Sequence, residues 1–363
     1  MRRRAFIAGL GGAALTAGRG LSARAETRPK ALARVDAADN RITRQIAGLR
    51  PFRPSGFVVR VEQLGARTLV HNYGHGGCGV TLSWGTADMA AKLALETQVR
   101  NAAVIGCGAV GLATARLLQD RGFDVVIYAK DVPPNTTSNI AAALFGVTSL
   151  VDDMHHTADI TGRIAQAARF AHRYFQNFLG DRYGVRWVEF FLIGDAPQNQ
   201  PWDFAITPEL YPLSVLDPAD NPFPTKYASS LPTMLIETNV YLPQMLSDFL
   251  LRGGRLRVRE FKDRTELQIL QEPLIINCTG LGAKALFDDA ELTPIKGQLT
   301  VLLPQPEVTY AYLDGARDLY MFSRRDAIIL GGSHERGVWS AQPDEAQATR
   351  ILEGHRQIAS AMR

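Results

Sequence analysis

Apolar and polar positions along the chain follow a pattern in which strands alternate with helices. Four apolar residues, Ala102 to Ile105, precede a glycine-rich turn, a helix over about Ala109 to Asp120 and a strand over Asp124 to Tyr128. Continuous apolar strands joined by helices are typical of a parallel sheet that is covered on both faces. The sequence therefore predicts an α/β fold.

The same pattern predicts further elements on both sides of this unit. Before it we expect strands over Ile42 to Leu49, Phe57 to Val61 and Thr68 to Val70, and an Ala-rich helix over about Thr81 to Leu95. After it we expect helices over Thr161 to Phe178, Leu242 to Leu251 and Asp344 to Met362, and strands over Val185 to Ile193, Arg255 to Phe261, Leu274 to Asn277, Gln298 to Leu303 and Ala327 to Gly331. The stretch from about 155 to 230 is rich in aromatic residues and prolines and is the least regular.

The first 25 residues read as an export signal. Arg3-Arg4-Ala5-Phe6-Ile7 resembles the twin-arginine pattern, an apolar run continues from Ala8 to Ala17, and Ala23-Arg24-Ala25 fits a cleavage site. The alternatives are a Sec signal and a wrongly chosen start codon. We expect the twin-arginine export machinery to deliver the protein to the periplasm or the medium.

Hydropathy and charge argue against two other classes of protein. The run from Ala8 to Ala17 is too short to span a bilayer, and no later stretch reaches the roughly 20 uncharged residues that a spanning helix needs, so no stable membrane insertion is expected. Five of the 40 Lys and Arg residues lie before Glu26, and without them the basic residues no longer outnumber the 36 acidic ones. The net charge therefore does not indicate a nucleic-acid partner.

Three cysteines, Cys78, Cys107 and Cys278, are too few and too odd in number for a disulfide framework. Each stands in a Gly-rich or strand-end motif, where small side chains pack. We expect all three to be structural.

The motif Gly106-Cys107-Gly108-Ala109-Val110-Gly111 follows a strand and begins a helix. Its first glycine permits a tight turn, its second lets the backbone approach a pyrophosphate, and its third lets helix and strand pack closely. Glycine-rich turns are common, so the motif alone is a weak signal, but this strand–turn–helix context favours dinucleotide binding over a purely structural turn.

The residues after the second strand indicate which dinucleotide is bound. The usual ribose-binding acid is missing after Tyr128, and Asp131, which follows Lys130, is either a ribose ligand or a solvated turn residue. Further on, Asn135-Thr136-Thr137-Ser138-Asn139 supplies hydroxyl and amide donors before Ile140-Ala141-Ala142-Ala143-Leu144, where we expect a helix to begin. Donors at this position suit a second phosphate and a ribityl chain, and of the two cofactors FAD has a ribityl chain whereas NAD does not.

Together with Asn277-Cys278-Thr279-Gly280 and Pro294-Ile295-Lys296-Gly297-Gln298, these motifs resemble the D-amino acid oxidase and D-aspartate oxidase family. Gly48-Leu49-Arg50-Pro51-Phe52-Arg53-Pro54 and the segment His71 to Gly85 resemble the C-terminal region of that family. Here they precede the dinucleotide turn. The order therefore indicates a circular permutation, in which the last segment of the family has moved to the front and residues 96–100 join it to the first strand.

The resemblance implies a glutathione-reductase-like flavoprotein, with a Rossmann-type FAD-binding domain on a parallel sheet and a substrate domain on an antiparallel sheet. The expected organisation is an export signal over 1–25, a linker over 26–40, strands of the substrate site over 41–70, the FAD-binding domain over 71–150 and 231–290, and the substrate domain with the final helix over 151–230 and 291–363. Order should begin near Arg41.

The resemblance also implies a substrate site. Arg50 matches the arginine that grips the substrate carboxylate, and Tyr320, which stands 11 residues before Gly331, matches a tyrosine that adds a hydroxyl to the same group. Gly77 matches the glycine whose carbonyl accepts a hydrogen bond from the substrate amine. The alternatives are a surface arginine held between prolines and a tyrosine that only packs in the core.

The implied cofactor is FAD, and its expected contacts come from six parts of the chain. The helix that begins near Thr81 would stabilise the negative charge of the reduced ring. The expected FAD-binding residues are Gly76, Gly77, Gly79, Val80, Thr81, Gly106, Cys107, Gly108, Val110, Gly111, Lys130, Asp131, Thr136, Thr137, Ser138, Ala142, Ala143, Leu144, Phe261 and Thr279. A rival hypothesis makes His71 and His75 metal ligands, but glycines interrupt any helix between them and no third ligand is evident. No metal is expected.

The reaction that the resemblance implies is oxidative deamination of a D-amino acid, with hydride transfer to flavin N5, hydrolysis of the imino acid, and reoxidation by dioxygen to give hydrogen peroxide. Two alternatives remain open. One is an FAD enzyme for glycine, sarcosine or another small amine with a different electron acceptor, and the other is a flavin-binding protein without catalysis. Arg324 or Arg325 near the entry would favour an acidic substrate side chain.

Overall fold

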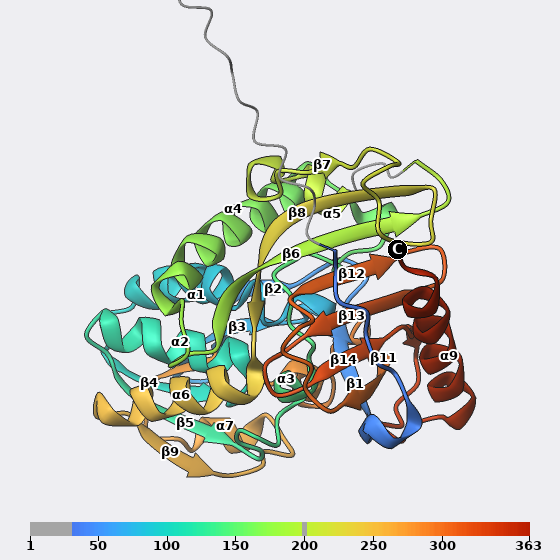
Figure 1. Ribbon diagram of the computed structural model, residues 1–363. Helices are drawn as coiled ribbons and strands as arrows, with labels where there is room; N and C mark the ends of the chain where they lie inside the picture. The colour runs from blue at the N-terminus through green and yellow to red at the C-terminus, as the bar shows by residue number, and fades with distance from the viewer. Residues whose placement is uncertain (1–30, 198–201) are drawn as a thin grey trace, which may run out of the picture. The chain divides into compact units, whose positions relative to one another are not determined.

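Two β-sheets organise the chain, as Figure 1 shows for the computed structural model. The structure describes residues 31–197 and 202–363. The export signal expected over residues 1–25 lies outside the described residues. None of the helices in the described part of the chain is long and apolar enough to cross a membrane.

The smaller sheet has six strands and contains the expected parallel unit. In spatial order they are β2 (Val58–Leu64), β3 (Arg67–Tyr73), β10 (Leu274–Asn277), β4 (Asn101–Ile105), β5 (Asp124–Ala129) and β9 (Arg255–Val258). Strands β3, β10, β4, β5 and β9 are parallel, and β2 joins β3 as an antiparallel edge strand.

Alternate residues of these strands are buried on opposite faces of the sheet. On β4, Ala102 and Val104 join a core that includes residues of helices α1 (Ser83–Leu95) and α2 (Ala109–Asp120), and Ala103 and Ile105 join the core of the other face. Burial of both faces explains why the strand is apolar throughout. Helices α4 (Ala158–Phe175) and α6 (Thr238–Leu251) pack against α1 and α2, respectively.

The crossing of α1 and α4 depends on one glycine. A Cβ atom on Gly85 would lie 2.1 Å from the Ala167 carbonyl oxygen and 2.4 Å from its Cα. No side chain fits at that separation, so the absence of a Cβ at Gly85 permits the close approach of the two backbones. The crossing anchors α1 directly after the His-Gly loop (residues 74–79).

The larger sheet is antiparallel except where β12 and β6 are parallel. Its strands in spatial order are β1 (Ile42–Phe52), β11 (Thr293–Leu302), β14 (Ile328–Gly331), β13 (Leu319–Ser323), β12 (Tyr310–Asp314), β6 (Val185–Gly194), β8 (Tyr227–Ile236) and β7 (Ser214–Val215), and β15 (Glu335–Arg336) also pairs with β11. Shorter helices are α3 (Thr137–Ile140), α5 (Trp202–Ala205), α7 (Thr265–Gln268) and α8 (Ala283–Phe287).

Helix α9 (Glu345–Ala361) packs on β11, β13 and β14 (Figure 1, red). Its first turn is capped by Asp344, whose backbone exchanges two hydrogen bonds with the buried side chain of Gln298 at 2.6 and 2.8 Å. Deeper in the contact, His355 Nδ1 lies 2.5 Å from the Tyr312 hydroxyl and its Nε2 lies 3.2 Å from the Gly331 carbonyl oxygen. Burial lowers the pKa of His355 to about 4, so the ring is neutral and can bridge both groups.

Most predicted elements are present. Helix α2 and strand β10 have the expected bounds, and strands β1 and β3 are longer than expected. The sequence pattern did not predict the strands β7, β8, β12, β13 and β15. Val35 and Ala37, in the stretch expected to be a linker, are buried against the region of α9.

The expectation of a helix that begins over 140–144 is wrong. The residues from Ile140 to Leu144 do not begin a helix: α3 ends at Ile140, and the chain continues beside β8, with an isolated bridge between Leu144 and Leu235. Ile236 N donates to the Ala143 carbonyl and Phe145 N donates to the Met234 carbonyl. These hydrogen bonds to a neighbouring strand outweigh the high intrinsic helix propensity of the alanines.

Candidate functional site

Four loops from distant parts of the sequence meet at one edge of the parallel sheet. Strands β3, β10, β4 and β5 run in one direction, with the neighbours in register His71, Asn277, Ile105 and Tyr128. Their carboxyl ends lead into the loops 74–79, 278–280, 106–111 and 130–131. From β4 the sheet extends to β5 on one side and to β10 on the other, and such a switch point is where open α/β sheets bind ligands.

The dinucleotide turn has the geometry that its glycines predict. Gly106 has a φ of 114°, and a Cβ there would lie 2.4 Å from the Cys278 carbonyl oxygen. A Cβ on Gly111 would lie 2.0 Å from the Gly106 carbonyl oxygen. The turn therefore packs tightly against the end of β10 and begins α2, whose N-terminal amides favour an anion.

The hydroxyl-rich segment comes to the N-terminus of α2. Ser138 Oγ accepts a hydrogen bond from Ala109 N at 3.0 Å and lies 3.0 Å from the position of a Cβ on Gly108. Thr136 is buried and bonds to Asn139 Oδ1 at 2.7 Å, whereas Thr137 is exposed. The structure thus places Ser138 beside Gly108, next to the expected position of the pyrophosphate.

The other expected cofactor contacts are placed as follows. Lys130 and Asp131 are exposed beside the end of β5, with 3.9 Å between Lys130 Nζ and the Asp131 carboxylate. Thr279 is the second residue after β10, whereas the ring of Phe261 packs in the core near Tyr128, with 5.9 Å between the ring centroids. Cys107 and Cys278 are buried, and burial raises the pKa of each thiol to about 12. Val110, at the start of α2, and Ala142, Ala143 and Leu144, in the segment that passes beside β8, are half-buried.

The His-Gly loop is held by segment 143–149. Gly77 N donates to the Ser149 carbonyl at 3.2 Å, and a Cβ on Gly76 would lie 2.1 Å from the same oxygen. Thr81 Oγ1 donates to the Gly146 carbonyl at 3.0 Å. At Gly79, by contrast, a Cβ would meet only the Cβ of His75, at 3.9 Å, so the space beside this backbone is open.

Arg50 and Tyr320 form a polar pair on the larger sheet. Arg50 Nη2 lies 3.4 Å from the Tyr320 hydroxyl, and its Nη1 donates to the Ser333 carbonyl at 3.2 Å. Two glycines make room for the pair. A Cβ on Gly297 would lie 2.4 Å from Arg50 Nη2, and one on Gly331 would lie 2.1 Å from Tyr320 Cζ. Burial raises the pKa of Tyr320, so its hydroxyl stays protonated and can donate.

Gly77 lies beside this pair. The position of its Cβ is 3.7 Å from Arg50 Cδ. The guanidinium of β1, the hydroxyl of β13 and the backbone of the His-Gly loop therefore come together although they belong to two sheets. A planar guanidinium with a hydroxyl beside it suits a carboxylate.

Backbone strain gathers around the same place. Ala143, Ser149 and Asp318 have φ angles of 57°, 52° and 49°, and they are three of the four non-glycine residues with positive φ in the described part of the chain. Ser149 contacts Gly77, and the Asp318 carbonyl lies against Gly332. Such conformations cost about 1–3 kcal/mol each and are typical of functional sites.

Two arginines that were expected to select an acidic substrate are occupied elsewhere. Arg324 is buried and forms two hydrogen bonds of 2.8 Å to Asp326, and Arg325 is paired with Asp181. Both arginines follow the C-terminal end of β13, whereas Tyr320 is near its N-terminal end. That hypothesis was therefore wrong, because each positive charge already has a carboxylate partner.

The histidines of the rival metal hypothesis point to different partners. His71 has both ring nitrogens hydrogen-bonded, to Glu62 and Asn277, and His75 Nε2 lies 2.9 Å from Thr86 Oγ1. Burial lowers the pKa of His75 to about 3, so its ring is neutral. Within residues 31–197 and 202–363 no group of three His, Cys, Asp or Glu side chains is placed to hold a metal ion.

Sequence reasoning missed residues that act through their backbones. Ser149 orients Gly77, Ser333 orients Arg50, and Gly297 leaves space for the Arg50 guanidinium. A carbonyl contact can come from any residue type. Among these residues only a glycine can be recognised from the sequence, and Gly297 belongs to the 294–298 motif, for which the sequence predicted no role in binding Arg50.

The glycines and hydroxyls at the sheet edge fit a flavin dinucleotide. Gly108 and the N-terminus of α2 suit the pyrophosphate, Ser138 lies within reach of the same place, and the open backbone at Gly79 suits a flat ring. The group would thus lie along the edge from the dinucleotide turn to the His-Gly loop.

Comparisons with known proteins agree with this geometry. Residues 9–93 and 101–361 match the family described as FAD dependent oxidoreductase. The chain is 27% identical to a D-amino acid oxidase of Dugesia ryukyuensis over 269 residues, which cover 72% of this chain and 78% of the relative. It is 27% identical to a D-aspartate oxidase of Homo sapiens over 253 residues, which cover 69% and 73%. The structure is similar to glycine oxidase from Geobacillus kaustophilus, with a TM-score of 0.53, 13% identity and coverage of 72% and 78%.

A side chain at Gly297 should weaken carboxylate binding. Because its Cβ would lie 2.4 Å from Arg50 Nη2, Gly297→Ala must displace the guanidinium, and we expect the affinity for a small carboxylate to fall about tenfold. Calorimetric titration measures this. The matched control is Gly162→Ala on α4, where a Cβ meets nothing within 4 Å. Equal affinities in the two variants would contradict the placement of Arg50.

Proposed function

The chain belongs to the FAD dependent oxidoreductase family, and from this premise we propose that it catalyses the oxidative deamination of a D-amino acid. It is an FAD-dependent oxidoreductase with an α/β fold. D-amino acid oxidases and a D-aspartate oxidase among its relatives support an amino acid as the substrate. We propose that the substrate is a D-amino acid, that dioxygen is the electron acceptor, and that the products are an imino acid and hydrogen peroxide.

The observation that carries the proposal is the meeting of Arg50, Tyr320 and Gly77. The guanidinium and the hydroxyl are 3.4 Å apart and suit the two oxygens of a carboxylate. Gly77 lies beside them on a loop that is held by Ser149. A carboxylate bound by the pair would place its α-amino group near the Gly77 backbone.

The chain's own residues bind and orient the substrate in this proposal. Arg50 neutralises the carboxylate, and Tyr320, whose pKa is raised by burial, donates its proton as a hydrogen bond without losing it. FAD, when bound, supplies the acceptor of the α-hydrogen as hydride. No side chain has to act as a base, because orientation brings the reacting atoms together.

We expect the wild-type protein to oxidise D-amino acids, and Arg50→Ala to lower kcat/KM for them by about 30- to 1000-fold, which corresponds to roughly 2–4 kcal/mol. Bound flavin, followed by its absorption, should stay unchanged. The measurement is peroxide release and dye reduction with a panel of D- and L-amino acids, glycine and sarcosine.

The matched control is Arg44→Ala, which removes an exposed arginine from the same strand. Its kcat/KM should equal that of the wild type. Oxidation of only glycine or sarcosine would replace the proposed substrate class, and unchanged turnover in Arg50→Ala would remove Arg50 from the site.

We also propose that the order of the chain is circularly permuted relative to its relatives. The family match falls into two segments, 9–93 and 101–361, on either side of the connection between α1 and β4. Most of residues 95–100 are exposed. On the other side of the fold, the Arg34 guanidinium donates to the Met362 carbonyl, so the two ends of the described fold are neighbours.

A rearranged chain tests this proposal. Residues 101–363 followed by a flexible linker of about ten residues and then residues 31–95 should fold and bind FAD like the original chain. The control opens the chain inside α1 and carries the same linker. FAD absorption and circular dichroism report the outcome. If neither rearranged chain binds FAD, the two blocks are not interchangeable in order.

We propose export by the twin-arginine pathway, on the pattern of Arg3 and Arg4. Replacement of both arginines by lysine keeps the charge and should retain the protein in the cytoplasm. Cell fractionation with immunoblotting measures this. Undiminished export of the double variant would leave the Sec pathway as the explanation.

A further inference from the structure

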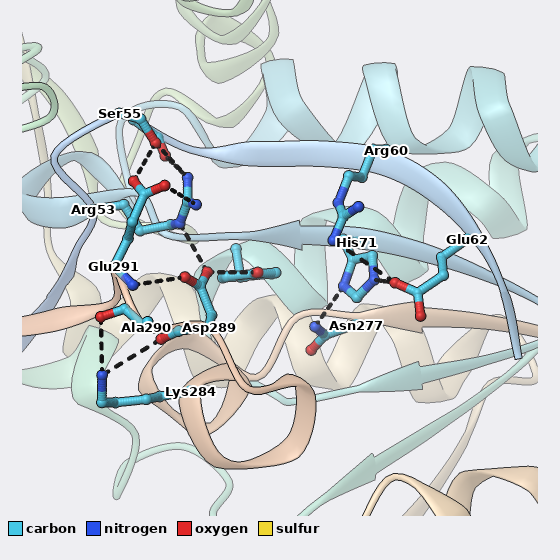
Figure 2. Close-up of polar contacts among 12 residues, drawn as sticks. Arg53, Ser55, Arg60, Glu62, His71, Asn277, Lys284, Asp289, Ala290 and Glu291 are labelled. Carbon is cyan, nitrogen blue, oxygen red and sulfur yellow. Dashed lines mark hydrogen bonds and ion pairs between the residues drawn. The ribbon is translucent and has the colours of Figure 1, made fainter. Parts of the chain in front are cut away.

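A line of hydrogen-bonded side chains runs from Glu62, which is partly exposed, to Thr279, at the edge of the parallel sheet where FAD is expected. His71 on β3 and Asn277 on β10 are opposite each other in the parallel register. Figure 2 shows the His71 ring between the side chains of Glu62 and Asn277. His71 Nε2 lies 3.0 Å from Glu62 Oε2, and His71 Nδ1 lies 3.1 Å from Asn277 Nδ2.

The orientation of every group in this line is determined by its neighbours. Asn277 Oδ1 accepts from Thr279 N at 3.1 Å and from Thr279 Oγ1 at 2.8 Å, so Nδ2 of the amide must face His71. An amide nitrogen only donates, and therefore His71 Nδ1 carries no proton. The proton is on Nε2 and is donated to Glu62.

The outer end of the line is a charged cluster. Arg264 Nη2 lies 2.6 Å from Glu62 Oε1, and Arg60 Nη2 lies 3.7 Å from Oε2. The Glu62 side chain is 26% exposed, whereas the His71 side chain is fully buried. The Glu62 carboxylate thus selects one tautomer of a ring that water does not reach.

The inner end is the loop that packs on the dinucleotide turn. Thr279, which is held by Asn277, follows Cys278, and the Cys278 carbonyl oxygen lies 2.4 Å from the position of a Cβ on Gly106. Cys278 N donates to the Ile105 carbonyl at 2.9 Å. The backbone of 277–279 is therefore one wall of the crevice in which the pyrophosphate is expected.

We propose that His71 is a positioning residue. By accepting a hydrogen bond from Asn277, it holds the 277–279 loop in the conformation that binds FAD. Glu62 assists by keeping the proton of His71 on Nε2. The proposal rests on FAD binding at this edge of the sheet and not on the identity of the substrate.

Two substitutions at His71 separate positioning from stability. The Oδ1 of Asn in His71→Asn stands near the place of Nδ1 and can still accept from Asn277, whereas Gln in His71→Gln reaches Glu62 but presents no acceptor to Asn277. Each variant thus keeps one of the two hydrogen bonds. We expect the Kd of FAD to stay within about threefold of the wild type in His71→Asn and to rise about tenfold in His71→Gln.

The measurement is FAD binding to the apoprotein by flavin fluorescence, with urea denaturation of each apoprotein alongside. A purely structural role would make the Kd follow stability, with equal effects of the two substitutions. That result, or no FAD binding by the wild type, would overturn the proposal. Loss of turnover with normal FAD binding would instead affect only the proposed function.

Substitutions at Glu62 provide a second test, because this side chain is partly exposed and its loss is tolerated more easily. Glu62→Gln offers an amide oxygen to His71 Nε2 and should leave the Kd of FAD unchanged. Glu62→Leu removes the acceptor, frees the tautomer of His71 and should weaken FAD binding about threefold. Equal Kd values for these two variants would also overturn the proposal.

Discussion

The parallel alignment of β3, β10, β4 and β5 is the constraint on which the site depends. Parallel strands end at the same edge, so four loops that are scattered along the sequence become neighbours without any contact between their side chains. The hydrogen bonds of the ladder hold the edge, and the glycines of each loop shape it. The positions of these loops therefore follow from the sheet, and their chemistry follows from their residues.

The substrate side of the site depends on a different feature, which is the absence of side chains at two glycines. Gly297 and Gly331 leave the space that the Arg50 guanidinium and the Tyr320 ring occupy. Behind them, His355 and Gln298 tie the strands of the larger sheet to α9. The polar pair is thus held by strands and a helix rather than by a flexible loop, which favours a constant geometry.

Sequence reasoning identified the parts of the fold and site that carry a residue-type signal. Three such features could be predicted: the glycines of the dinucleotide turn, the apolar strand β4 and the arginine of the 48–54 motif. The non-helical course of residues 141–144 could not be predicted, because its cause is hydrogen bonding to β8, which begins more than 80 residues later. Ser149 and Ser333 act through carbonyl groups, which every residue has. The ion pair of Arg324 with Asp326 could not be predicted either, because it depends on how the chain turns after β13.

The distance in sequence between β3 and β10 has a consequence for biosynthesis. His71 and Asn277 are 206 residues apart, yet they are neighbours in the finished sheet. During translation β3 emerges long before the strand that will flank it, and only the β2 hairpin can pair with it at first. Contacts of such high order slow folding and leave a strand edge open to wrong partners. The charged residues Arg60 and Glu62 on the neighbouring β2 are suited to keep that nascent hairpin soluble until β10 has been synthesised.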